Sequence, residues 1–320
     1  MKLPEAQGDS VILKYDEVEM NELQERIIKL KEEKDAIILA HSYQTLDIQQ
    51  IADFVGDSLQ LSIMASQTDK DLIIFCGVKF MAETAKILKP DAKVVLPVEG
   101  AGCPMADMID GDDLRKFKAE HPGAVVVCYV NSTAAVKAES DICCTSSNAV
   151  KILNSIPIHK EILFVPDQNL GKWASAQSGR DVIVWDGYCL VHHFGIKPDR
   201  IKTMRKNYPD HKIVVHPECT PDVTALADLV ASTAGMVKFT EENDKVIIGT
   251  EVGLYEQLKD RFPEKDIIVL APDAICRNMK KTKLVDVYNA LADEAPVVIL
   301  DPDVAQKAGA SVHRMMELSK

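Results

Sequence analysis

Three apolar runs decide the fold of this chain: Lys93-Val-Val-Leu-Pro97, Asp181-Val-Ile-Val-Trp185 and Asp266-Ile-Ile-Val-Leu-Ala271. Continuous apolar runs of this kind are typical of strands in parallel sheets that helices cover on both faces. Each run leads into a cysteine, and these cysteines, Cys103, Cys189 and Cys276, stand 86 and 87 residues apart. The pattern therefore predicts three similar units, each with one thiol after a strand.

The rest of the chain repeats this alternation of short apolar runs and amphipathic segments. A helix is predicted over 19–34, and strands are predicted over 36–40, 72–76, 93–97, 124–129, 161–165, 181–185, 212–216, 246–249, 266–271 and 296–300. So many parallel strands rarely form one open sheet. We therefore expect an α/β protein of three similar three-layer α/β/α units, with short parallel sheets arranged around a pseudo-threefold axis. A single (β/α)8 barrel is the structural alternative, because it too gathers functional residues at the carboxyl ends of its strands.

The cysteine period also sets the expected boundaries of the units. The first unit is predicted to cover 1–106 and to take up the C-terminal tail 277–320, the second to cover 107–192, and the third to cover 193–276. No linker rich in Gly, Pro or Ser separates these ranges, so we expect the units to pack tightly.

Composition and charge limit the classes of function. The 320 residues are 47% apolar and 27% charged, and the net charge is −12 without a basic cluster. Nucleic acid is therefore not an expected partner, because neutralising phosphates requires a basic stripe. Residues 1–10 lack the apolar core of a signal peptide, and no apolar run approaches the ~18 residues of a membrane helix, so a cytoplasmic protein without a membrane partner is expected. In that reducing compartment the eight cysteines are not expected to form disulfides, and metal ligation or catalysis is the better interpretation of those in loops.

Three thiols at corresponding strand ends would converge if the units pack around an axis. Three thiolates can hold one metal centre and leave a further position open for chemistry. Sulfur-only ligation suits either a three-cysteine zinc site or an iron–sulfur cluster, and the spacing leaves both open. Cys76, Cys128 and the adjacent pair Cys143-Cys144 are expected in the packing instead. His192 stands three residues after Cys189 and is a candidate neighbour of the metal.

Polar side chains lie at or just after the end of the first predicted strand of each unit. In chain order they are His41, Tyr43, Tyr129, Asn131, His216 and Glu218. The carboxyl ends of parallel strands form the ligand crevice of α/β units, so these side chains are candidates for one common site. Taken singly, each is equally consistent with a hydrogen-bonded structural role.

Short hydroxyl-bearing turns form a second set of candidates. They are Gly56-Asp-Ser58, Cys143-Cys-Thr-Ser146-Ser-Asn and Ala231-Ser-Thr233-Ala-Gly235. Each opens an amphipathic segment, so helix capping is one interpretation. The other is anion binding, because free N–H groups and hydroxyls at a helix start bind phosphate or carboxylate. An acidic protein could accept an anionic ligand in this way.

Nine ordered motifs resemble those of the quinolinate synthase family. They are Leu39-Ala-His41-Ser-Tyr43-Gln44, Val55-Gly-Asp-Ser58-Leu, Cys76-Gly-Val-Lys-Phe80-Met81, Gly102-Cys103-Pro-Met-Ala-Asp-Met108, Cys128-Tyr129-Val-Asn131-Ser, Thr145-Ser146-Ser-Asn, Asp186-Gly-Tyr-Cys189, His216-Pro-Glu218-Cys and Ala271-Pro-Asp. The resemblance covers about residues 20 to 310. It implies three α/β units with one [4Fe–4S] cluster per chain on their pseudo-threefold axis. It also implies condensation of iminoaspartate with dihydroxyacetone phosphate to quinolinate, with release of phosphate and two waters, in de novo NAD biosynthesis.

The resemblance further implies roles for individual residues. The implied cluster ligands are Cys103, Cys189 and Cys276. The implied substrate-binding residues are His41, Ser58, Tyr129, Asn131, Ser146, His216, Glu218 and Thr233. The implied catalytic residues are Glu218, as the acid/base, with Tyr43, His41 and His192 assisting. Some relatives carry C-x-x-C-x-x-C around the last ligand, whereas Cys276-Arg-Asn-Met279 has one thiol, so no disulfide control is expected there.

Two other functions stay open at this stage. One is an iron–sulfur hydro-lyase acting on a single small dicarboxylate, and the other is a non-catalytic iron–sulfur sensor of oxygen or iron. A sensor needs a response surface or a partner domain, and the sequence offers no sign of either. The implied partners are therefore the small-molecule substrates, with a functional link to an L-aspartate oxidase or dehydrogenase that supplies iminoaspartate.

Overall fold

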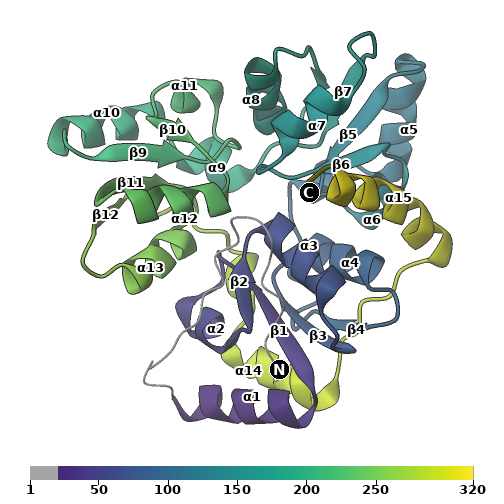
Figure 1. Cartoon of the computed structure of the whole chain (residues 1–320), viewed down its shortest axis with the longest axis vertical. Helices are drawn as coiled ribbons and strands as arrows, with labels where there is room; N and C mark the ends of the chain where they lie inside the picture. Colours follow the sequence, from purple (N-terminus) through teal and green to yellow (C-terminus); the bar gives the residue numbers. More distant parts are fainter. Residues whose placement is uncertain (1–20, 320) are drawn as a thin grey trace.

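The computed structural model describes residues 21–319, and within them the strands form three separate sheets of four parallel strands each. The three sheets share one topology: the first strand of each unit lies between the second and the third, and the fourth pairs with the third. Figure 1 shows the three units arranged around a common centre. The expected α/β fold of three similar units is confirmed, and a single closed barrel is excluded.

Each sheet is built from four strands that are consecutive in the chain. The first sheet contains β1 (Ala36–His41), β2 (Phe54–Gly56), β3 (Leu72–Cys76) and β4 (Lys93–Val95). The second contains β5 (Val125–Tyr129), β6 (Ile142–Cys144), β7 (Ile162–Val165) and β8 (Ile183–Val184). The third contains β9 (Lys212–Val215), β10 (Leu229–Val230), β11 (Lys245–Gly249) and β12 (Asp266–Val269).

The helices also recur at corresponding positions. Before the first strands lie α1 (Glu22–Glu33), α5 (Gly111–Glu120), α9 (Leu190–Gly195) and α10 (Pro198–Asn207). After the first strands lie α2 (Leu46–Ile51), α6 (Ala134–Ala138) and α11 (Pro221–Thr224), and after the second strands α3 (Ser58–Gln67), α7 (Ala149–Ser155) and α12 (Thr233–Glu242). After the third strands lie α4 (Lys79–Leu88), α8 (Gln168–Ser178) and α13 (Val252–Arg261). Short 3-10 turns cover Ala106–Met108 and Met279–Lys281.

Each unit is layered because its strands are buried on both faces. In β1, for example, Ile38 belongs to the core on the side of α1, whereas Ile37 and Leu39 belong to the core on the opposite side. That second core also contains Val246 and Ile248 of β11, so the first and third units share one apolar interior. Burial of this kind stabilises the protein by roughly 25 cal/mol for each Å² of apolar surface removed from water.

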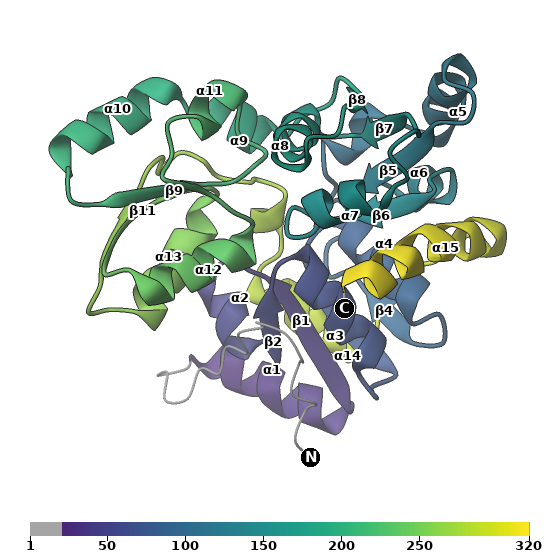
Figure 2. The ribbon, with the colours of Figure 1, turned by 45° about the horizontal axis from the view of Figure 1, so that its top comes forward.

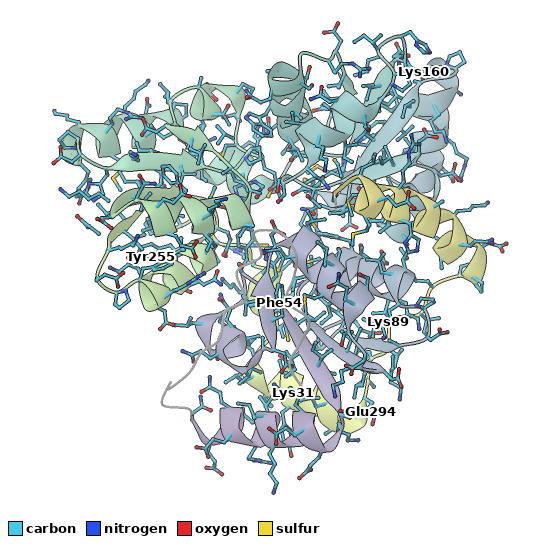
Figure 3. The ribbon with its side chains drawn as sticks, in the orientation of Figure 1. Lys31, Phe54, Lys89, Lys160, Tyr255 and Glu294 are labelled. Atoms are coloured by element: carbon cyan, nitrogen blue, oxygen red, sulfur yellow. The ribbon has the colours of Figure 1, made fainter. Side chains whose placement is uncertain are left out.

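The C-terminal tail divides between two units. Helix α14 (Leu284–Asp293) packs against α1 and β3, and Glu294 at its end, labelled in Figure 3, pairs with Lys34 at 2.9 Å and Lys93 at 2.6 Å. Helix α15 (Pro302–Ser319) packs instead against α6 and β6 and also contacts α4, as Figure 2 shows in yellow. The unit boundaries drawn from the cysteine period stay predictions.

Four strand assignments differ from the sequence-based expectation. The predicted strand over 296–300 is wrong, because this segment makes only an isolated antiparallel bridge, from Val297 to Val95. The three strands that were not predicted, β2, β6 and β10, each pair with the first strand of their unit. They are two or three residues long and, unlike the equally short β4 and β8, do not lie in a longer apolar run. The predicted helix over 19–34 appears as α1, and residues 19 and 20 lie outside the described part of the chain.

Candidate active site and metal centre

A pocket of about 680 Å³, counting the space open to solvent at its mouth, lies where the three units meet. All of the site residues expected from the sequence line it: His41, Tyr43, Ser58, Cys103, Tyr129, Asn131, Ser146, Cys189, His192, His216, Glu218, Thr233 and Cys276. The structure therefore brings together the strand-end set, the hydroxyl set and the cysteine set.

The parallel sheets explain how distant residues reach this pocket. His41 is the last residue of β1, Tyr129 is the last residue of β5, and His216 directly follows β9. These three strands hold the same central place in their sheets. Because the carboxyl ends of parallel strands meet the same crevice, three equivalent positions supply three side chains to one site.

Three helix starts border the same pocket. Ser58 is the first residue of α3 and Thr233 is the first residue of α12, whereas Ser146 lies three residues before α7. Asp57 caps α3 and also accepts a hydrogen bond from Ser147 Oγ at 2.9 Å, which joins the first and second units. Hydroxyls and free N–H groups at helix starts favour an anion, as the sequence indicated.

Glu218 is the centre of a buried polar network. Its Oε1 accepts hydrogen bonds from Tyr129 Oη at 2.7 Å and Asn131 Nδ2 at 3.4 Å, and its Oε2 lies 2.7 Å from His192 Nδ1. Burial raises the pKa of Glu218, but His192, His216 and the Tyr129 hydrogen bond outweigh burial and hold the pKa below its usual range. The side chain is therefore a carboxylate at neutral pH.

A second chain of hydrogen bonds runs through Tyr43. Its hydroxyl shares hydrogen bonds with Thr250 Oγ1 at 2.7 Å and Thr233 Oγ1 at 3.2 Å, and Thr250 Oγ1 lies 2.8 Å from His192 Nε2. Burial, with the nearby Glu218 carboxylate, raises the pKa of Tyr43 well above its usual value. Tyr43 is thus a neutral phenol that can donate a proton or a hydrogen bond.

His41 and His216 have equivalent local geometry. Each accepts a hydrogen bond at Nδ1 from the backbone N–H two residues later, at 3.1 Å from Tyr43 and 3.3 Å from Glu218. Burial lowers the pKa of both imidazoles to about 3. They are therefore neutral at pH 7, and because Nδ1 accepts, Nε2 carries the hydrogen and can donate to a ligand.

The three cysteine loops are held by one repeated hydrogen bond. In each unit, the first residue of the helix after the third strand donates its N–H to the carbonyl two residues before the cysteine. The pairs are Lys79 to Ala101 at 2.8 Å, Gln168 to Gly187 at 2.8 Å and Val252 to Ala274 at 3.0 Å. Burial raises the pKa of Cys103 to about 12 and also raises the pKa of Cys189 and Cys276. Because a metal binds the thiolate form, its binding would release these protons.

At least two of the three cysteine sulfur atoms lie more than 4.8 Å apart. Within residues 21–319 the one group of metal-ligating side chains whose ligand atoms all lie within 4.8 Å of each other is Cys189, His192 and Glu218, and the three cysteines do not form such a group. Ligand atoms around one tetrahedral zinc ion lie about 3.3–3.8 Å apart, given bonds of about 2.0–2.3 Å. The three thiols are thus too widely spaced to share a single zinc ion without moving.

Sequence reasoning missed several residues of the pocket. Asp57, Thr145 and Glu251 line it as well, and Lys280 forms an ion pair with Glu251 at 3.2 Å. Asp57 and Thr145 lie inside the hydroxyl-bearing turns, so those turns could have identified them. Glu251 could have been found by its position two residues after β11, the counterpart of Asp167 two residues after β7.

The fold and the pocket together define a class: an α/β protein with three parallel-sheet units that build one buried, polar and thiol-lined site for a small molecule. A family model described as Quinolinate synthetase A protein matches residues 25–317. The chain therefore belongs to the quinolinate synthase family of enzymes.

Relatives named quinolinate synthase resemble the chain over nearly its whole length. The protein from Alkaliphilus metalliredigens is 51% identical over 297 residues, which cover 92% of this chain and 97% of the relative. That from Methanoregula boonei is 48% identical over 298 residues, covering 92% of this chain and 98% of the relative. That from Geotalea uraniireducens is 46% identical over 302 residues, covering 94% and 99%. In the part of the chain that the structure describes, none of the helices has the length and apolar character needed to cross a membrane.

Proposed function

We propose that the chain is a quinolinate synthase of NAD biosynthesis, which condenses iminoaspartate with dihydroxyacetone phosphate and releases quinolinate, phosphate and two waters. The observation that carries this proposal is that one cysteine from each unit lines the same pocket as the strand-end and hydroxyl residues. Membership of the family supports the named reaction, because the relatives carry that name. An L-aspartate oxidase or dehydrogenase would supply the iminoaspartate.

The proposed cofactor is one [4Fe–4S] cluster per chain, held by Cys103, Cys189 and Cys276. The donor set fits this group, because each unit offers one thiol from a loop held by the same backbone hydrogen bond. Thiols too widely spaced for a single zinc ion also favour a larger polynuclear centre. When bound, the cluster supplies an iron without a protein ligand, which can act as a Lewis acid on a substrate oxygen.

The chain's own residues would bind the two anionic substrates without a surplus of positive side chains. Ser58, Ser146 and Thr233 offer hydroxyls and helix-start N–H groups to carboxylate or phosphate oxygens. The Nε2–H groups of His41 and His216 add neutral donors. Holding two reactants together in this way can lower a barrier by as much as ~7–11 kcal/mol, because the encounter becomes a positioned reaction.

Glu218 and Tyr43 are the proposed proton-transfer residues. Glu218 is a carboxylate steadied by Tyr129, Asn131 and His192, so it can remove a substrate proton and later return one. Tyr43 is a neutral phenol that can donate to a leaving or developing oxygen. Asn131 Oδ1 is buried and, within residues 21–319, makes no hydrogen bond, so it is free to accept one from a substrate amine or hydroxyl.

The test of the function is an anaerobic assay with both proposed substrates. Quinolinate absorbance and released phosphate should rise together, and protein prepared anaerobically should be brown with about four irons per chain. A product formed from a single dicarboxylate would favour the hydro-lyase alternative. Failure of the metal-free chain to take up iron on anaerobic reconstitution with iron and sulfide would contradict the cofactor assignment.

Cysteine variants test the ligand assignment separately. Serine in place of Cys103, Cys189 or Cys276 should abolish the cluster, because each change removes one thiolate. Serine in place of Cys128 or Cys144 should retain it, with lower stability from burying a hydroxyl, since both thiols are fully buried in the second unit. Iron content by inductively coupled plasma spectrometry decides the matter. Iron retained in Cys189→Ser but lost in Cys144→Ser would refute the assignment.

A further inference from the structure

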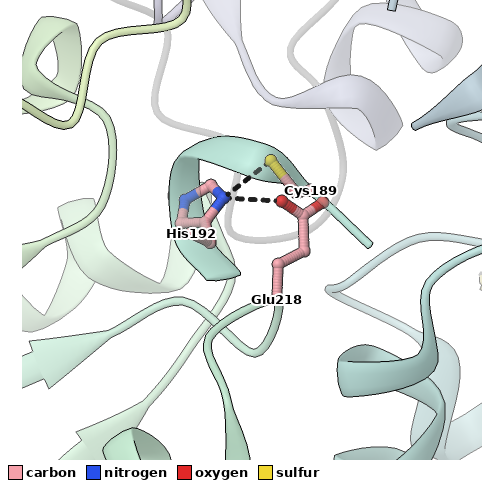
Figure 4. A group of neighbouring side chains, drawn as sticks. All are labelled: Cys189, His192 and Glu218. Carbon is pink, nitrogen blue, oxygen red and sulfur yellow. Dashed lines mark hydrogen bonds and ion pairs between the residues drawn. The ribbon is translucent and has the colours of Figure 1, made fainter. Parts of the chain in front are cut away.

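Cys189, His192 and Glu218 form a compact group that differs from the three-cysteine set. The Sγ atom of Cys189 lies 3.3 Å from His192 Nδ1, and Glu218 Oε2 lies 2.7 Å from the same nitrogen. One ligand atom from each residue lies within 4.8 Å of the other two. Figure 4 shows the thiol and the carboxylate on the same side of the imidazole ring, with both contacts drawn.

The surroundings of this group are those of a protein metal site. Metal-bound histidines nearly always place their second ring nitrogen against a hydrogen-bond partner, and ligating carboxylates are hydrogen-bonded in turn. His192 Nε2 lies 2.8 Å from Thr250 Oγ1, and Glu218 Oε1 accepts from Tyr129 Oη at 2.7 Å. His192 and Glu218 are 1% and 3% exposed, so water does not compete freely for them. Both ligand side chains are therefore oriented in advance.

Two of the three ligand-atom distances fit a tetrahedral ion after a small adjustment, and the third, from Cys189 Sγ to the Glu218 carboxylate oxygen, is within 4.8 Å. Ligand atoms around zinc lie about 3.3–3.8 Å apart. The sulfur-to-nitrogen distance of 3.3 Å already matches, whereas the 2.7 Å separation of His192 Nδ1 and Glu218 Oε2 must widen by about half an ångström. A thiolate, an imidazole and a carboxylate are all zinc ligands, and three protein ligands leave a fourth position for water or substrate.

We infer that the chain without its cluster binds one Zn²⁺ ion at Cys189 Sγ, His192 Nδ1 and Glu218 Oε2, and that this ion and the iron–sulfur cluster exclude each other. Exclusion follows because both would use the Cys189 thiolate. The exclusion rests on the proposed function, which places the cluster on Cys189, whereas zinc binding itself does not depend on that proposal. Zinc at this place also occupies the Glu218 carboxylate, so a zinc-loaded chain would be inactive even with the pocket intact.

The experiment uses the full-length chain freed of iron by chelation under argon, with the thiols kept reduced. Zn²⁺ is titrated against a competing chelator dye, and Co²⁺ serves as a spectroscopic probe. One Zn²⁺ per chain should bind, and Co²⁺ should give a thiolate-to-metal charge-transfer band with the strong visible absorption of a tetrahedral ion. Circular dichroism confirms that each protein is folded before titration.

Two sets of variants separate this site from a three-thiol zinc site. Cys189→Ser, His192→Asn and Glu218→Gln should each lower the zinc affinity at least about 10-fold, because each removes a ligand atom. Cys103→Ser and Cys276→Ser are the matched controls and should leave the affinity unchanged within error. Equal loss in all three cysteine variants, with normal binding in His192→Asn, would overturn the inference, as would wild-type protein that takes up no zinc.

Thr250→Val provides a test that leaves all three ligands in place. The change removes the hydroxyl next to His192 Nε2, and the loss of such a partner lowers metal affinity by about 10-fold or more. Thr240→Val is the control, because Thr240 is an equally buried threonine whose hydroxyl bonds only to its own helix, at Met236 O. Unchanged zinc affinity in Thr250→Val would count against His192 as a ligand.

Exclusion is tested by attempting to rebuild the cluster with iron and sulfide in zinc-loaded chain. Incorporation of iron should stall until a chelator removes the zinc. Iron uptake with zinc still bound would disprove exclusion while leaving the zinc site in place. If the chain with a rebuilt cluster excludes zinc but makes no quinolinate, the proposed function is wrong and the zinc inference stands. The two failures are therefore distinguishable.

Discussion

Glu218 and Thr233 line the same pocket but contribute different chemistry. Glu218 is a carboxylate placed against two imidazoles and a phenol, whereas Thr233 offers a hydroxyl at the start of α12. Glu218→Gln preserves size and hydrogen bonding but removes the basic group, so it should leave iron content and substrate-analogue binding largely intact. Turnover should fall by at least about 100-fold, the usual scale of general acid–base catalysis.

Thr233→Ala is the contrasting variant, because it removes a hydroxyl and no titrating group. We expect it to weaken the apparent affinity for substrate by about 0.5–1.5 kcal/mol, the net value of one hydrogen bond, with a smaller effect on turnover. Anaerobic steady-state kinetics on both variants measures the difference. If Thr233→Ala stopped turnover while Glu218→Gln changed only the apparent affinity, the two roles would have to be exchanged.

The buried histidines predict how stability depends on pH. The folded-state pKa of His41, about 3, lies below its ordinary value of 6.5. Between these values the unfolded chain binds the proton and the folded chain does not, so stability is lost as pH falls from about 6.5 towards 3. Each such histidine steepens the slope of the free energy of unfolding by up to about 1.4 kcal/mol per pH unit.

His41→Asn should therefore flatten this slope in urea unfolding of cluster-free protein between pH 4 and pH 6. An asparagine oxygen can still accept the Tyr43 N–H that His41 Nδ1 accepts, so the turn is preserved. His313→Asn is the control, since His313 is exposed on α15. Equal slopes in His41→Asn and the unchanged chain would contradict a neutral, buried His41.

At the scale of elements, a helix-capping carboxylate holds the cysteine loops of the second and third units, whereas the Cys103 loop of the first unit has no such carboxylate. Asp167 caps α8 and its Oδ2 accepts the N–H of Cys189 at 3.2 Å, while Glu251 caps α13 and its Oε1 accepts the N–H of Cys276 at 3.0 Å. The corresponding cap of α4 is Val78, which has no side-chain acceptor. The loops of the second and third units are thus tied to their helices more firmly than the first.

Asp167→Ala should therefore speed the loss of iron to a chelator while leaving the cluster able to form. The loss of the cap itself costs about 1 kcal/mol of stability. Asn21→Ala is the matched control, because Asn21 caps α1 by the same kind of bond far from any cysteine. Asn21→Ala measures the loss of stability from a helix cap alone, and only Asp167→Ala should release iron faster. Equal iron release would mean that the carboxylate acts only as a helix cap.

Sequence patterns predicted the long strands and the polar residues at strand ends. They missed the short edge strands and the carboxylates that accept hydrogen bonds from the backbone N–H groups of the cysteine loops. The central strands were predictable because buried parallel strands have continuous apolar runs, as in β1 and β11. The edge strand β10 is two residues long and is held by pairing with β9, a tertiary contact that no local pattern encodes. The 296–300 run is apolar, yet it lies antiparallel beside β4. Asp167 resembles an ordinary helix cap, and only the folded structure shows that it also holds a cysteine loop.

At the scale of the whole molecule, the three units share their interiors. One core joins strands of the first and third sheets, and another joins the second sheet to Ile87 and Leu88 of α4 and to α15. Lys137 of α6, with no exposed surface, donates to Thr84 Oγ1 of α4 at 2.9 Å, across the boundary between the first and second units. Because no unit closes its core alone, the molecule should unfold as one cooperative body.

Met315→Ala tests this cooperativity, because Met315 of α15 is fully buried in the core of the second unit. The substitution should cost about 2–5 kcal/mol of stability by leaving a cavity. Both tryptophans, Trp173 and Trp185, belong to the second unit, so fluorescence reports that unit alone, whereas far-UV circular dichroism reports helices of all three. Urea unfolding curves from the two probes should coincide in the unchanged chain, and in Met315→Ala they should move together to lower urea concentration. A shift confined to the fluorescence curve would mean that the second unit unfolds by itself, and that the shared cores do not couple the three parts of the active site.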